Sequence, residues 1–134
     1  MSLAIAGRAL APFAVAAAAL RLARLERRAG VDALVRRLRE GRPLPRPLAD
    51  PRLYPPVVDA LIRWLPPHRR LGRCVKRSLI LLHLWSRCGL APTFHYGVAL
   101  GPDGSRRAHA WLSGGPAGAA GGDAGAGFVE PLAL

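Results

Sequence analysis

The chain has two cysteines, and one of them stands where a nucleophile is expected. Cys74 lies at or beside the first turn of a predicted helix over residues 73–87, where unpaired backbone N–H groups and the positive end of the helix dipole favour a thiolate. Three neighbouring residues add positive charge: Arg73, Lys76 and Arg77. Cys88 lies at the opposite, negative end of this helix, among apolar residues. We therefore predict that Cys74 is the nucleophile and that Cys88 belongs to the core.

A thiolate nucleophile needs a group that holds and later delivers a proton, and histidine has the pKa that suits this near neutrality. Two of the four histidines are badly placed for the work. His68 lies in a basic loop bounded by prolines, and His83 follows Cys74 by more than two helical turns. Neither is expected to reach the start of the helix.

The other two histidines, His95 and His109, lie on predicted strands, and either could face the helix. In the run Ala108-His109-Ala110-Trp111, small neighbours leave the imidazole accessible and the indole of Trp111 can form a wall of the site. This context favours His109 as the general base. His95 is the alternative.

A carboxylate or amide usually orients such an imidazole, and two acidic residues follow the predicted strand. If residues 113–122 form the tip of a hairpin around Pro116, Asp123 falls beside His109. Spacing alone is also compatible with a solvated loop aspartate among glycines, and Glu130 is the alternative orienting residue. The predicted triad is Cys74, His109 and Asp123.

The elements that must position these residues follow from periodicity and turn signals. Apolar residues at spacings of three and four predict helices over residues 3–28, 33–40, 57–65 and 73–87. Alternation at a period of two predicts strands over residues 93–100, 105–113 and 128–134, the last at a sheet edge because it contains proline. Six prolines between residues 42 and 56 predict an extended connector without helix. The fold class is α+β, with a helix packed on a small antiparallel sheet.

The length of 134 residues allows one domain with one core. We expect an N-terminal helical appendage and connector over residues 1–56 and a catalytic core over residues 57–134. The formal charge of +12 arises almost entirely from arginine and attracts anions. A basic nucleic-acid-binding or membrane-associated protein with a non-catalytic fold is therefore the alternative function, although the tryptophans, Phe94 and Tyr96 lie mainly on predicted apolar faces.

The N-terminal segment is apolar but is expected to remain outside the bilayer core. Between Arg8 and Arg21, the apolar stretch from Ala9 to Leu20 has only twelve residues and is interrupted by Pro12, whereas a spanning helix needs about 20. Arginines follow at once, which is atypical of a signal-peptide cleavage region. We expect a cytoplasmic protein with free thiols, possible peripheral contact with the inner membrane face, and no cofactor or metal.

Three short runs resemble a known family. The runs 73–79 (Arg-Cys-Val-Lys-Arg-Ser-Leu), 96–98 (Tyr-Gly-Val) and 108–111 (Ala-His-Ala-Trp) closely resemble the lasso peptide biosynthesis B protein. That family consists of leader-peptide cysteine proteases of transglutaminase-like fold. The resemblance is specific from residue 73 to about residue 113 and loose elsewhere. It implies a papain- or transglutaminase-like architecture with Cys74 as nucleophile and His109 as base.

The resemblance also implies partners, and the chain departs from the family at one place. The implied partners are a ribosomally made precursor peptide, a separate leader-binding protein and an ATP-dependent lasso cyclase; no nucleic acid is expected. After Trp111 the family usually has a hydrophobic residue, a glutamate and a short Asp-Gly turn, whereas this chain has Leu112, Ser113 and an expanded Gly/Ala stretch. Asp123 is the nearest equivalent of the family's aspartate. Residues 1–72 lack the strands of a leader-recognition domain.

Overall fold

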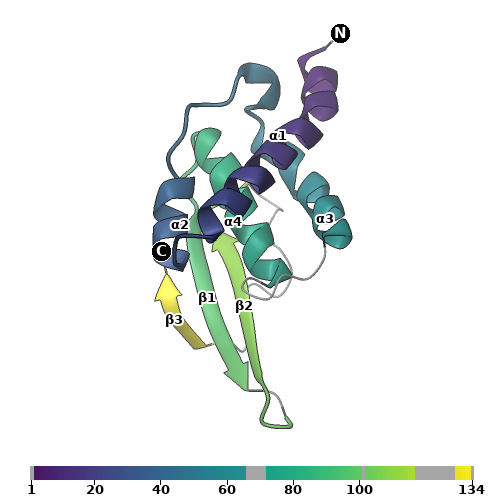
Figure 1. Cartoon of the computed structure of the whole chain (residues 1–134). Helices are drawn as coiled ribbons and strands as arrows, with labels where there is room; N and C mark the ends of the chain where they lie inside the picture. The colour runs from purple at the N-terminus through teal and green to yellow at the C-terminus, as the bar shows by residue number, and fades with distance from the viewer. Residues whose placement is uncertain (1, 66–71, 101, 117–128, 134) are drawn as a thin grey trace.

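A computed structural model describes residues 2–65, 72–100, 102–116 and 129–133 (Figure 1). The helices come first along the chain, and the strands of a small antiparallel sheet follow them, as the α+β class predicts. The helical elements are α1 (Leu3–Glu26), α2 (Val31–Leu38), the short 3-10 helices η1 (Arg46–Leu48) and η2 (Pro51–Leu53), α3 (Tyr54–Trp64) and α4 (Arg73–Arg87). The strands are β1 (Thr93–Leu100), β2 (Arg106–Ser113) and β3 (Val129–Ala133).

Helix α4 is the centre of the molecule. Residues 78–85 are all buried, and α4 packs against α1, α2, α3 and both long strands. Gly72 precedes it in extended conformation, and Gly89 follows it with φ +89°, a conformation that glycine adopts without strain. These signals confirm the predicted helix over residues 73–87, and they fix which residue begins it.

The sheet has the strand order β2-β1-β3, and both pairings are antiparallel. The β1–β2 register pairs Phe94 with Leu112 and Tyr96 with Ala110. Phe94 and Ala110 belong to the hydrophobic core, so their face of the sheet is the one that packs on the helices. Since side chains alternate along a strand, His109 lies on the other face. The predicted hairpin is confirmed, and β2 and β3 are the two edge strands.

The connector differs from the prediction, because it contains helical turns. The short helices η1 and η2 begin with prolines in their first turn, where the missing N–H group is not needed. For the same reason α3 begins at Tyr54, three residues earlier than predicted, and carries Pro55 and Pro56 in its first turn. The helix predicted over residues 33–40 is also shifted, since Gly30 precedes its first residue, Val31.

Helix α1 is part of the same core as the rest of the chain. Its buried residues are spaced by three and four along one face: Ala11, Val15, Ala18 and Leu22. They join one hydrophobic cluster with residues of α2, α3, α4 and the sheet. The core thus draws on both sides of the boundary expected between residues 56 and 57.

Helix α1 approaches the connector closely at Gly7, and this contact provides a test of the packing. A Cβ atom on Gly7 would lie 2.2 Å from the carbonyl oxygen of Pro47, a backbone atom. Gly7→Ala is therefore expected to lower the free energy of unfolding by about 1–3 kcal/mol, measured by urea denaturation. If α1 were not packed on the rest of the domain, Gly7→Ala would instead stabilise the helix by about 1 kcal/mol. An increase in the free energy of unfolding would therefore contradict the packing.

Candidate active site

Cys74 is the second residue of α4 and is half-buried. Its Sγ lies 4.0 Å from the position that a Cβ on Gly72 would occupy, so the thiol is directed back toward the start of the helix, as helical side chains are. The N-cap residue is glycine and supplies no side-chain acceptor. The N-cap side chain therefore does not occupy the first backbone N–H groups of α4, which lie near the thiol.

The positive charge near the thiol is smaller than the sequence indicates. The guanidinium Nε of Arg77 donates a hydrogen bond to the carboxylate of Asp59 in α3, and the two side chains form an ion pair. This pair offsets the charge of Arg77 and ties the first turns of α4 to α3. The positive charge beside Cys74 therefore comes mainly from Arg73, which is exposed, and Lys76, which is half-buried.

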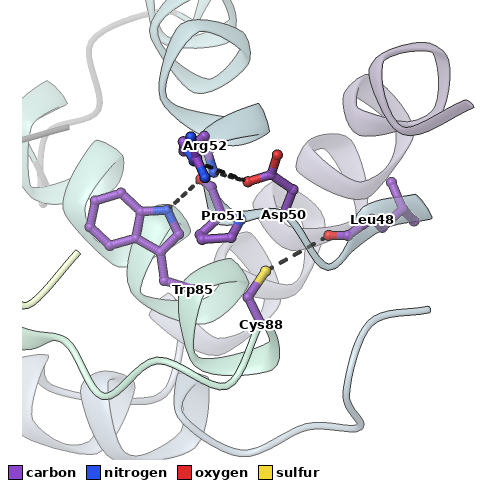
Figure 2. Close-up of polar contacts among 6 residues, drawn as sticks. All are labelled: Leu48, Asp50, Pro51, Arg52, Trp85 and Cys88. Atoms are coloured by element: carbon purple, nitrogen blue, oxygen red, sulfur yellow. Dashed lines mark hydrogen bonds and ion pairs between the residues drawn. The ribbon is translucent and has the colours of Figure 1, made fainter. Parts of the chain in front are cut away.

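Cys88, the C-cap residue of α4, is in a different environment (Figure 2). Its Sγ donates a weak hydrogen bond to the carbonyl oxygen of Leu48, 3.7 Å away. Burial, with the nearby negative charge of Asp50, raises the pKa of the Cys88 thiol to about 11. In the same region, the indole Nε1 of Trp85 donates a hydrogen bond to the carbonyl oxygen of Pro51. The interpretation of Cys88 as a packing residue is confirmed.

This contrast predicts selective alkylation of the two thiols. With a pKa of about 11, roughly one Cys88 in a thousand is a thiolate at about pH 8, and only the thiolate reacts. Cys74, at an open helix start, should react with iodoacetamide at least about tenfold faster. Peptide mapping by mass spectrometry measures both rates in one sample. Preferential labelling of Cys88 would reverse the assignment of the nucleophile.

His109 forms part of a stack of three rings on β1 and β2. The imidazole of His109 stacks on the indole of Trp111, with centroids 5.7 Å apart and planes inclined by 18°. His95 stacks on the same indole at 5.3 Å and 5°, because the register pairs it with Trp111. The stack restrains the orientation of His109, and Trp111 forms a wall beside it, as the sequence predicts.

The two histidines of this stack differ in their neighbours. A ring nitrogen of His95, Nε2, is hydrogen-bonded to the hydroxyl of Ser113 at 2.7 Å. His109 pairs across the strands with Gly97, which has no side chain. In this stack, His95 is therefore hydrogen-bonded to Ser113, whereas the residue paired with His109 across the strands is a glycine.

The structure brings together the elements that carry Cys74 and His109. Helix α4 packs on β2 more extensively than on β1, and Figure 1 shows the helix beside the two long strands. Because Ala110 belongs to the face that packs on the helices, His109 lies on the opposite face of the sheet, and the pairing of its imidazole with the thiol of Cys74 stays a prediction. Both side chains are half-buried, which leaves each of them accessible from solvent.

The remaining histidine of the described residues has a packing role. The Nδ1 of His83 lies 2.7 Å from the carbonyl oxygen of Leu38, which ties α4 to the end of α2. Burial lowers the pKa of His83, so its neutral form is the favoured one. This agrees with its exclusion as the general base. His68 lies outside the described residues.

Of the two predicted orienting carboxylates, Asp123 lies outside the described residues. Glu130 belongs to β3, which pairs with β1 on the side away from β2. Its backbone is therefore two strand spacings, about 10 Å, from the strand of His109. The role of either residue stays a prediction. Within residues 2–65, 72–100, 102–116 and 129–133, no three His, Cys, Asp or Glu side chains gather as metal ligands would.

Comparison with known proteins gives one match. The sequence model of the family described as "Transglutaminase-like superfamily" matches residues 13–131. The matched range contains α4 with Cys74 and β2 with His109, and it also includes most of α1. No curated protein and no solved structure matches the chain.

Proposed function

Because this chain belongs to the transglutaminase-like superfamily, we propose that it is a cysteine protease that removes the leader peptide from a lasso peptide precursor. The superfamily includes cysteine proteases. The observation that carries the proposal is the position of Cys74 in the first turn of α4, a helix that packs on the strand of His109. The choice of substrate rests on the sequence resemblance over residues 73–113.

In the first step, the thiolate of Cys74 attacks the carbonyl carbon of the scissile peptide bond. A C–S bond forms, and the carbonyl oxygen takes the negative charge of the tetrahedral intermediate. The backbone N–H groups at the uncapped start of α4 are suitable donors to this oxygen, and the helix dipole adds to their effect. Arg73 and Lys76 stabilise the thiolate before attack.

His109 carries the proton through the reaction. Its imidazole takes the thiol proton and gives it to the departing amine when the C–N bond breaks, which leaves a thioester on Cys74. The same imidazole then takes a proton from water, whose oxygen attacks the thioester and releases the leader with a free carboxylate. Stacking on Trp111 restrains the ring during both steps, and Asp123 is the proposed orienting carboxylate.

The proposed reaction takes place in the cytoplasm, where thiols remain reduced. A separate leader-binding protein presents the precursor, and an ATP-dependent cyclase takes up the core peptide through its new amino group. These partners follow from the family resemblance. The chain's net charge of +12 favours acidic partners at moderate salt.

The proposal is tested by incubating the full chain with a precursor and its leader-binding protein in water enriched in heavy oxygen. Mass spectrometry should find a leader whose new carboxylate contains one heavy oxygen atom, and a core peptide with a free amino group. Transfer of the acyl group to an added amine in place of water would indicate a transferase of the same superfamily. Absence of both products in the presence of the partner would contradict the proposal.

A further inference from the structure

The outward face of α1 has no partner within the described residues. Six large hydrophobic side chains are exposed in this part of the chain, and five of them lie on α1. Their exposed fractions are Leu3 60%, Ile5 57%, Leu10 43%, Phe13 72% and Leu20 59%. The sixth, Trp64, ends α3. We call the five residues on α1 the apolar stripe.

Helix α1 is apolar on both of its faces, which is unusual for a helix at the surface of a domain. One face is buried in the core through Ala11, Val15, Ala18 and Leu22. The opposite face, from Ala9 to Leu20, contains only alanine, proline, phenylalanine and leucine. The helix is long and apolar enough to cross a membrane, by length and composition only.

Arginines follow the apolar stripe at its C-terminal end, and others lie beside the start of α1. Arg24 and Arg27 follow Leu20 by four and seven residues, so they lie on the same side of the helix, and both are exposed. Near the start of α1, Leu3 and Arg8 line a groove of about 770 Å³ between this helix and the connector, and the groove also contains Arg46. Asp50 and Arg52 share this groove and form an ion pair, so Arg8 and Arg46 supply the excess positive charge.

We infer that α1 docks on a bilayer containing anionic lipid, with the apolar stripe in the acyl region and the arginines against phosphate groups. The buried face holds the helix on the domain, so the helix lies along the membrane surface. Crossing the membrane would remove Ala11, Val15, Ala18 and Leu22 from the hydrophobic core. A face without hydrogen-bonding side chains suits lipid chains, which offer no polar partner. A second copy of the chain is disfavoured because it would bring like charges together.

The test uses the full chain and vesicles of neutral lipid with or without anionic lipid. Co-sedimentation should be at least about tenfold stronger with anionic vesicles at low salt, and high salt should weaken it. The double variant Phe13→Glu/Leu20→Glu and the double variant Arg24→Glu/Arg27→Glu should each bind at least about tenfold more weakly. Trp64→Glu, at an exposed apolar residue away from the stripe, is the matched control and should bind like the wild type.

Circular dichroism establishes that each variant is folded, which is expected since the replaced side chains are exposed. Equal sedimentation of the wild type and both double variants would overturn the inference. So would a solution dimer that the Phe13→Glu/Leu20→Glu variant abolishes, or a loss of precursor cleavage in that variant without vesicles, since these results identify a protein as the occupant. Vesicle binding requires no catalysis, so a Cys74→Ala chain should bind vesicles normally.

Discussion

Replacement of Cys74 by alanine is expected to reduce the rate of precursor cleavage by at least about a thousandfold. The side chain is half-buried at the start of α4, where it packs against the margin of the core, and alanine removes only its sulfur atom. The protein should therefore remain folded, with an unfolding free energy within about 1 kcal/mol of the wild type. Cleavage is measured by mass spectrometry of the leader and core peptides over time.

Cys88→Ala is the matched control, because it removes the other thiol of the chain from the other end of α4. This variant should keep the cleavage rate within a few-fold of the wild type, while losing some stability through its contacts with the core. A Cys74→Ala chain that cleaves at a normal rate would show that the thiol does not carry the reaction. A normal rate would also remove the role assigned to the start of α4.

His109→Ala is expected to reduce cleavage to a similar degree, by about a thousandfold or more. The imidazole is needed twice, to take the proton of the thiol and to deliver it to the leaving amine. The combined variant Cys74→Ala/His109→Ala should be little slower than either single variant, because the two groups act as a unit. Rates are measured under single-turnover conditions with the leader-binding protein present.

His95→Ala provides the comparison within the same stack of rings. Like His109, His95 stacks on the indole of Trp111, and it is also hydrogen-bonded to Ser113. Its loss should change the cleavage rate only a few-fold, through the orientation of Trp111. A large loss in His95→Ala together with a small loss in His109→Ala would exchange the roles of the two histidines.

The sequence predicts the central helix and the hairpin well, since strong local signals agree with the packing there. Glycines at positions 72 and 89 mark both ends of α4, and its apolar periodicity is continuous. Along β1 and β2 the alternation of side chains is regular enough to predict the strands to within a residue. Local signals and burial are consistent in these elements.

The connector and the start of α3 are predicted less well, for a physical reason. Proline opposes helix in the interior of an element, but it is tolerated in the first turn, where its missing N–H is not needed. Pro51, Pro55 and Pro56 all occupy such positions. Their density suggests an extended segment, whereas tertiary contacts such as that from Trp85 to Pro51 allow short helical turns.

At the candidate site, the position of Cys74 is predictable and the histidine stack is only partly so. A helix start can be identified from local sequence. The pairing of His95 with Trp111 depends on the register of the hairpin, which no local pattern at either residue indicates. The offset of the charge on Arg77 depends on Asp59, eighteen residues earlier, and no local pattern indicates it.

The central claim is that the imidazole of His109 takes the proton from the thiol of Cys74. Its most direct test is the rate of alkylation of Cys74 at about pH 6, where an unassisted thiol with an ordinary pKa near 8.5 is almost fully protonated. In a Cys88→Ala background with one remaining thiol, we expect His109→Ala to slow this reaction by at least about tenfold. Equal rates with and without the imidazole would contradict the claim.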